Sequence, residues 1–227
     1  MHAVYLHGFA SSPDSSKARF LSARLAELGI TLLCPDLNKP NFSTLTVSRM
    51  IGKTERLIAG LDPGPIAVIG SSLGAFVGLH VAERVWRASG PGSVNPHPIE
   101  HLVLLAPAFD FRAGLQGRLG TDGLEQWRVT DRLEVDHFAE GRVRYVHYAL
   151  YADAGEYDSF AATAPVPTLV LQGRRDQVVD PSMVVRYARG RDHATLVLLD
   201  DDHQLKGSLE RVWTEISLFL GLGSLDP

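Results

Sequence analysis

An α/β architecture with a doubly wound, mostly parallel sheet of about six strands is expected from this sequence. Short apolar runs alternate along the chain with stretches of helical periodicity. The apolar runs are continuous instead of alternating apolar with polar, as in strands that helices cover on both faces. The length of 227 residues suits one large domain, so we expect residues 1–227 to form a single unit.

The expected strands are short runs rich in Val, Ile, Leu and Ala. In chain order they are 3–6, 31–34, 66–69, 102–106, 168–172 and 195–199. Five amphipathic stretches between or after these runs predict helices over 15–28, 46–60, 73–88, 181–188 and 208–220. Strand–helix–strand repetition predicts parallel pairing with right-handed crossovers.

The start of the first expected helix allows two interpretations. Its apolar side is formed by Ala18, Leu21, Leu25 and Leu28. The preceding stretch 11–17, Ser-Ser-Pro-Asp-Ser-Ser-Lys, could bind an anion at a helix start. The favoured alternative is Ser and Asp capping with Pro13 in the first turn.

Residues 107–164 interrupt the strand–helix rhythm between the fourth and fifth strands. They hold nine of the 18 aromatic residues, in about a quarter of the chain. The segments 132–138 and 142–148 alternate apolar and polar positions around Glu140-Gly141, which predicts a hairpin. An insert at the carboxyl edge of a parallel sheet overlies the usual site, so a lid is expected. The alternative is an insert whose aromatics form a small core of their own.

Composition and charge exclude several classes of protein. The composition, 45% hydrophobic and 21% charged, is that of a soluble globular protein. A net charge of −4 argues against nucleic acid and anionic membranes as partners. Cys34 is the only cysteine, and neither a leader segment nor a membrane-length apolar run is visible, so a cytoplasmic location is expected. The stretch 89–98 is expected to be a Gly/Pro-rich surface loop. Oligomeric state does not follow from the sequence.

Residues 70–74, Gly-Ser-Ser-Leu-Gly, fit the pattern G-x-S-x-G with Ser72 at its centre. An expected strand precedes the pattern and an expected helix follows it, which is the context of a nucleophilic serine on a tight turn. Gly70 and Gly74 remove the side chains that would crowd such a turn. We therefore expect Ser72 to be the nucleophile and Ser71 to fill a variable position. The alternative is that Ser72 only caps the helix.

A serine hydroxyl needs a general base, and the base needs a group that orients it. With a serine in this context, the two follow in the order Asp or Glu, then His. Asp176 follows the fifth expected strand and His203 follows the sixth, which favours them for these roles. Asp180, before Pro181, is expected to cap a helix. The acidic run 200–202 is expected to be a solvated turn.

Backbone donors near Ser72 would stabilise negative charge developing on a substrate oxygen. Gly8 follows the first strand and would let the backbone approach a substrate. We expect the N–H groups of Phe9 and Leu73 to form this oxyanion hole. His7 precedes the serine in the chain, so chain order favours a structural role in bracing the loop.

Residues 5–18 contain His-Gly-Phe, a Ser-Ser-Pro turn and Ser-x-Lys-Ala. With these motifs, the opening of the chain resembles that of a group of small bacterial esterases in the α/β-hydrolase superfamily, and it is the most specific piece of the resemblance. Residues 70–75, 173–180 and 201–205 carry the other shared motifs. The insert is longer than in compact members of the group.

This resemblance implies an α/β-hydrolase fold that lacks the first two antiparallel strands of larger members. It implies a triad of Ser72, Asp176 and His203, with Phe9 and Leu73 as oxyanion donors. It also implies hydrolysis of carboxylic esters with short acyl chains through an acyl-enzyme intermediate.

The expected partner is therefore a small-molecule ester. No organic cofactor is expected, and no metal, because H-E-x-x-H and Cys/His clusters at ligand spacing are missing from the sequence. The same scaffold could instead support an acyltransferase, a perhydrolase or a carbon–carbon lyase. A non-catalytic protein that binds a ligand in the same pocket is a further alternative.

Overall fold

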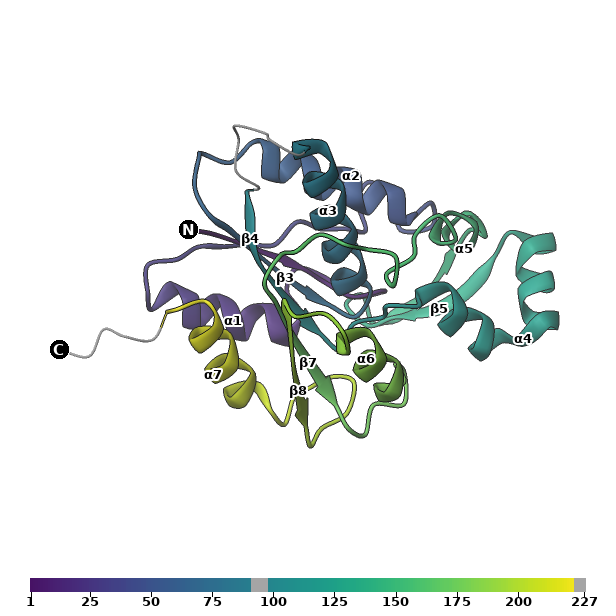
Figure 1. The fold of residues 1–227 in the computed structure, drawn as a ribbon. Helices are drawn as coiled ribbons and strands as arrows, with labels where there is room; N and C mark the ends of the chain where they lie inside the picture. Colours follow the sequence, from purple (N-terminus) through teal and green to yellow (C-terminus); the bar gives the residue numbers. More distant parts are fainter. Residues whose placement is uncertain (91–97, 223–227) are drawn as a thin grey trace.

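Six parallel strands form the central sheet of the computed structural model, which describes residues 1–90 and 98–222 (Figure 1). Their order across the sheet is β2-β1-β3-β4-β7-β8. The bounds are β1 His2–Leu6, β2 Leu32–Leu33, β3 Ile66–Ser71, β4 Ile99–Leu105, β7 Thr168–Gly173 and β8 Ala194–Leu199. Each corresponds to one expected strand. The expected loop 89–98 falls mostly outside the described residues.

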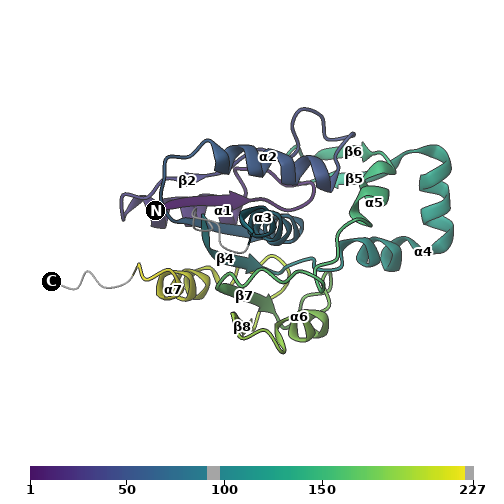
Figure 2. The same ribbon diagram turned by 45° about the horizontal axis from the view of Figure 1, so that its top comes forward.

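Helices cover both faces of this sheet (Figures 1 and 2). On one face lie α1 (Ser16–Ala26) and α7 (Leu209–Phe219), and on the other α2 (Val47–Ala59), α3 (Leu73–Ser89) and α6 (Pro181–Ala188). Successive strand residues point to opposite faces of the sheet, so each strand contributes side chains to two separate apolar clusters. These helices and the sheet confirm the expected doubly wound architecture.

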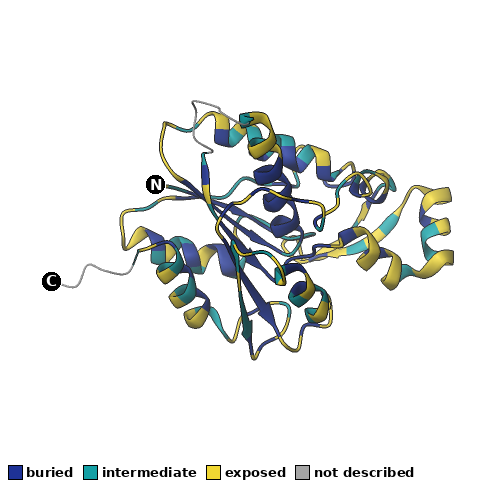
Figure 3. Ribbon diagram, in the orientation of Figure 1, coloured by how far each residue is buried: buried dark blue, intermediate teal, exposed yellow. Residues whose placement is uncertain are grey.

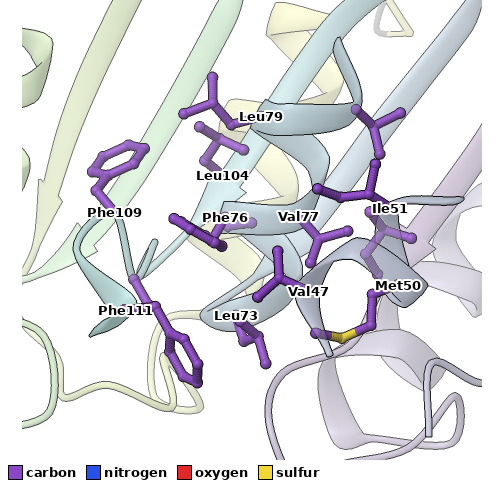
Figure 4. Packing of buried hydrophobic residues seen from close by; sticks show 14 of the residues in the cluster. Val47, Met50, Ile51, Leu73, Phe76, Val77, Leu79, Leu104, Phe109 and Phe111 are labelled. Carbon is purple, nitrogen blue, oxygen red and sulfur yellow. The ribbon is translucent and has the colours of Figure 1, made fainter. Parts of the chain in front are cut away.

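The face covered by α2 and α3 carries the larger cluster (Figure 4). Val47, Met50 and Ile51 of α2 are buried against α3, at the spacing of one helix face. Phe76 and Val77 of α3 are 1% and 0% exposed. Burying side chains of this size contributes roughly 1.5–3 kcal/mol each to the free energy of unfolding. These contacts fix α3 against the sheet, and with it the turn that joins the end of β3 to α3.

The insert lies between β4 and β7. It consists of α4 (Phe111–Thr130), the antiparallel strands β5 (Leu133–His137) and β6 (Arg142–Val146), and α5 (Ala149–Ala154). The expected hairpin is confirmed, whereas the two helices did not follow from the sequence. The distal part of α4 projects from the body and is largely exposed (Figure 3).

The buried side chains of the insert do not form a core of their own. Trp127, Val146 and Leu150 belong to the same cluster as the α2, α3 and sheet residues. The alternative of a separate aromatic core is therefore wrong.

Two local expectations at the first helix are also wrong. The helix ends at Ala26, and Leu28 beyond it is 41% exposed, because the chain has already turned away from the core. Ser15 is the N-cap and accepts a hydrogen bond from the Ala18 N–H, so Pro13 precedes the helix instead of lying in its first turn. Within residues 1–90 and 98–222, the helices are too short or too polar to span a bilayer.

Candidate active site

Ser72 stands at the turn between β3 and α3 with φ +54° and ψ −116°. A positive φ is unfavourable for a non-glycine residue and marks a strained turn. A Cβ at Gly70 would lie 2.5 Å from the Ala75 Cα, and one at Gly74 would overlap the Leu6 carbonyl oxygen. The two glycines are thus required by close backbone packing. The Ser72 side chain makes no capping hydrogen bond to α3, so the alternative of a simple helix cap is wrong.

The structure brings together three side chains that are far apart in the sequence. The His203 Nε2 lies 3.1 Å from the Ser72 Oγ, and its Nδ1 lies 2.8 Å from Asp176 Oδ2. Asp176 follows β7 and His203 follows β8, so neighbouring parallel strands deliver both to the same sheet edge as Ser72. With the Asp176 side chain fully buried and the imidazole 13% exposed, the chain of hydrogen bonds is shielded from water.

Asp176 is held as a carboxylate. Burial raises its pKa, but hydrogen bonds from His203, the Val179 N–H and Gln172 outweigh this and set the pKa below its ordinary value. Its Oδ1 accepts from the N–H groups of Val178 and Val179 at 2.8 and 2.9 Å. A carboxylate fixed in this way can hold the Nδ1–H tautomer of His203, which leaves Nε2 free to accept a proton.

Gln172 was not predicted from the sequence. It is fully buried at the end of β7, and its Nε2 donates to Asp176 Oδ2 at 2.9 Å. The only local signal is a polar residue closing an otherwise apolar strand, Thr-Leu-Val-Leu-Gln. Gln172 therefore orients the carboxylate from the side opposite the backbone donors.

The loop after β1 lies directly against Ser72. A Cβ at Gly8 would lie 3.4 Å from the Ser72 Cβ, so the backbone there approaches closely. Among the described residues, the Phe9 N–H has no backbone acceptor, and the Leu73 N–H belongs to the first turn of α3, where intrahelical acceptors are lacking. Both donors are thus available near the serine.

His7 braces this loop from behind. It is 2% exposed, its Nδ1 pairs with the Gly8 carbonyl oxygen at 2.9 Å, and its Nε2 accepts from the Leu37 N–H at 3.0 Å. Burial lowers the pKa of His7, which favours this neutral tautomer. Among the described residues, His7 has no hydrogen bond to Ser72, so its contacts hold the loop and do not reach the serine.

A cavity of about 750 Å³ opens at Ser72 and Phe9. Its walls come from the first two turns of α4 and from residues 177–186. The apolar part of its lining includes Ala108, Phe111, Leu115, Val179 and Met183. A second cavity of about 690 Å³, lined in part by Ser11, Asp36 and Gln204, does not include Ser72.

Two expectations for acidic residues have different outcomes. Asp180 accepts from the Ser182 N–H at 2.8 Å and caps α6, with Pro181 as the first helical residue, as expected. Asp200 and Asp202 are exposed, but Asp201 is only 8% exposed, so the expectation of a fully solvated acidic turn is wrong. In the described part of the chain, no three His, Cys, Asp or Glu side chains gather as metal ligands would.

Solved structures with the same fold are numerous. Est1E from Butyrivibrio proteoclasticus, with ferulic acid bound, aligns with a TM-score of 0.79 at 19% identity, over 97% of this chain and 88% of its own. Mouse alpha/beta hydrolase domain-containing protein 10 gives 0.78 at 18%, over 98% and 90%. The Pyrococcus furiosus esterase Pf2001 gives 0.67 at 20%, over 97% and 82%.

At these identities the likeness shows the α/β-hydrolase fold. The curated proteins contain no match to the chain. A family model, described as "Uncharacterised protein family (UPF0227)", matches residues 2–220. The chain therefore belongs to the UPF0227 family.

Proposed function

We propose that the protein is a serine hydrolase that cleaves carboxylic esters. The observation that carries this proposal is the pair of His203 contacts, 3.1 Å to the Ser72 Oγ and 2.8 Å to Asp176. An imidazole that contacts a hydroxyl on one side and a carboxylate on the other can activate the hydroxyl as a nucleophile. The proposal is further supported by the fold, which the chain shares with esterases such as Pf2001.

In the proposed reaction, His203 removes the Ser72 proton as Ser72 Oγ attacks the ester carbonyl carbon. Asp176 stabilises the imidazolium that forms. The N–H groups of Phe9 and Leu73 donate to the oxyanion of the tetrahedral intermediate. His203 then protonates the leaving alcohol, and water attacks the acyl-enzyme by the reverse sequence of proton transfers.

The proposed substrates are small-molecule esters, with short acyl chains preferred. A panel of nitrophenyl esters from two to sixteen acyl carbons tests the preference, and acetate and butyrate are expected to be the best substrates. A long-chain optimum would contradict it. Product analysis in the presence of a competing alcohol separates hydrolysis from acyl transfer.

The replacement Ser72→Ala tests the nucleophile, with Ser71→Ala as the matched control. Ser72→Ala should reduce kcat by at least about 10⁴-fold, because the attacking oxygen is lost. Ser71 lies at the end of β3 and is 4% exposed, so Ser71→Ala should retain activity within about tenfold. A fluorophosphonate probe should label Ser72 covalently. Equal losses in the two variants, or an adduct at another residue, would refute the assignment.

A further inference from the structure

Lys17 is a buried charged residue that the proposed reaction does not use. It lies in the first turn of α1 and is 7% exposed. Its Nζ donates to the Gln204 carbonyl oxygen at 2.8 Å, across 187 positions of sequence. Lysine is rarely buried without a partner, because removing an ammonium group from water is costly. A specific contact to the residue after His203 therefore calls for an explanation.

Several charged groups act on the Lys17 ammonium. Burial, and then the charge of Lys206, disfavours its positive charge, whereas the carboxylates of Asp202, Asp176 and Asp201 stabilise it. In Asp201, one carboxylate oxygen accepts from the Asp202 N–H at 2.8 Å, whereas the other has no hydrogen-bond partner among the described residues. The ammonium thus offsets negative charge that the turn places in a buried position.

The turn that carries His203 needs support from outside. The Arg175 N–H holds the Asp201 carbonyl at 3.0 Å, and the Gln204 N–H bonds to Asp202 Oδ1 at 2.7 Å. Leu205, fully buried, has φ +53°, which is unfavourable for a bulky residue. Such a conformation persists only where surrounding contacts impose it. Lys17 supplies one such contact to this turn, from helix α1.

We propose that Lys17 is a positioning residue for His203: its ammonium ties the start of α1 to the turn 201–205 and so keeps the imidazole within reach of Ser72. The inference rests on the proposed role of His203 as general base. Lys17 touches neither Ser72 nor the cavity beside it, so it acts only through the turn. A purely structural tie between α1 and the rest of the molecule is the competing explanation.

The variants Lys17→Met, Lys17→Gln and Lys17→Arg separate the two explanations. Arg24→Met is the matched control, because Arg24 also ties α1 to a distant element, through a 2.6 Å ion pair with the exposed Glu210 of α7. Lys17→Met should lower kcat on nitrophenyl acetate about 10- to 100-fold, since a small displacement of a reacting group has effects of this order. KM should stay within about twofold. Lys17→Arg should recover part of the loss, and Arg24→Met should behave as wild type.

One further measurement does not depend on ester turnover. The rate at which a fluorophosphonate labels Ser72 should fall in Lys17→Met in parallel with kcat, because labelling also requires His203 to take the Ser72 proton. A structural tie predicts no such change as long as the variant is folded.

The possible outcomes are distinct. A wild-type kcat and a wild-type labelling rate in a folded Lys17→Met variant would overturn the inference. If Lys17→Met does not fold, Lys17→Gln decides in the same way, because it removes the charge and shortens the side chain by one atom. A wild-type protein that labels at Ser72 but hydrolyses no ester would refute the ester-hydrolase proposal alone, and the labelling rates would still decide the role of Lys17. Folded wild-type protein with neither labelling nor turnover would refute both.

Discussion

The Lys17 ammonium group loses its proton far more readily than an ordinary lysine. Burial, and then the charge of Lys206, lowers its pKa from 10.5 to about 8, although Asp202, Asp176 and Asp201 act in the opposite direction. The unfolded chain therefore binds this proton more tightly than the folded protein does between about pH 8 and 10.5. Over that window the unfolded state holds more protons, so the free energy of unfolding rises with pH.

This predicts that wild-type protein gains stability relative to Lys17→Met as the pH rises from 7.5 to 9. The expected relative gain is about 1 kcal/mol, from a slope of up to about 1.4 kcal/mol per pH unit. Urea unfolding of both proteins at the two pH values measures it. Burial raises the pKa of Cys34 to about 11 and that of Tyr5 to about 12, but both groups are present in both proteins and cancel in the difference. An unchanged difference would mean that Lys17 is not buried as a cation.

At the scale of single residues, the sequence predicts those site residues that a local pattern or the chain order indicates. The flanking glycines indicate Ser72, and the positions directly after strands indicate Asp176 and His203. Lys17 and Gln172 could not be found in this way. Their contacts, to Gln204 and Asp176, depend on how α1 and β7 are placed in space, and a single polar residue beside an apolar run does not indicate its partner.

Among the helices, α4 is built with unusual glycines. Gly114 and Gly117 lie in its interior, and a Cβ at either position would meet no atom within 4 Å. Both line the cavity that opens at Ser72. Glycine in a helix interior costs about 1 kcal/mol relative to alanine, and packing against neighbours does not require it here. The consequence is a wider cavity along α4.

We therefore expect Gly114→Ala and Gly117→Ala each to raise the free energy of unfolding, by about 0.5–1 kcal/mol. Gly117→Trp should fill part of the cavity and lower kcat/KM for the larger nitrophenyl esters more than for the acetate. Gly117→Ala is the control for the change of backbone propensity alone. Urea unfolding and the ester panel give the two readouts. Loss of stability in the alanine variants, or equal effects of tryptophan on all esters, would contradict this account of α4.

The glycines also explain why α4 was not predicted while the other long helices were. Glycines recur at 114, 117, 120 and 123, and Gly120 has φ +67° where the helix bends. The apolar spacing of α2 or α3 is therefore missing, and only Phe111, Leu115 and Trp127 are buried along the twenty residues of α4. Tertiary contacts at its two ends determine this helix, and these are not visible in a local pattern. The six strands, each a continuous apolar run, were predictable for the opposite reason.

At the scale of the whole molecule, the insert is tied to the body by several kinds of contact. Glu83 of α3, only 5% exposed, accepts from the N–H groups of Thr163 and Ala164 at 2.8 and 2.7 Å. Burial raises the pKa of Glu83, but these bonds and Arg87 outweigh it and lower the pKa overall. Asp153 of α5 accepts from the Ser48 N–H of α2 at 2.8 Å. These bonds, together with the shared apolar cluster, join the insert to the sheet through α2 and α3.

Because one cluster holds both parts, we expect the insert 107–164 and the body to unfold together. Trp127 reports on the insert: it is 1% exposed, and its indole N–H donates to the Val146 carbonyl oxygen at 2.9 Å. The other two tryptophans, Trp86 and Trp213, lie outside it, so the double variant Trp86→Phe/Trp213→Phe leaves Trp127 as the only indole. Its fluorescence and the far-ultraviolet circular dichroism should then give the same urea midpoint within error, as all-or-none unfolding requires. An earlier fluorescence midpoint would mean that the insert opens while the sheet is intact, which is the behaviour of a lid with a stability of its own. Coincident midpoints would instead mean that the insert does not unfold separately. Any movement of the insert would then be a rotation of folded elements about bends such as the one at Gly120.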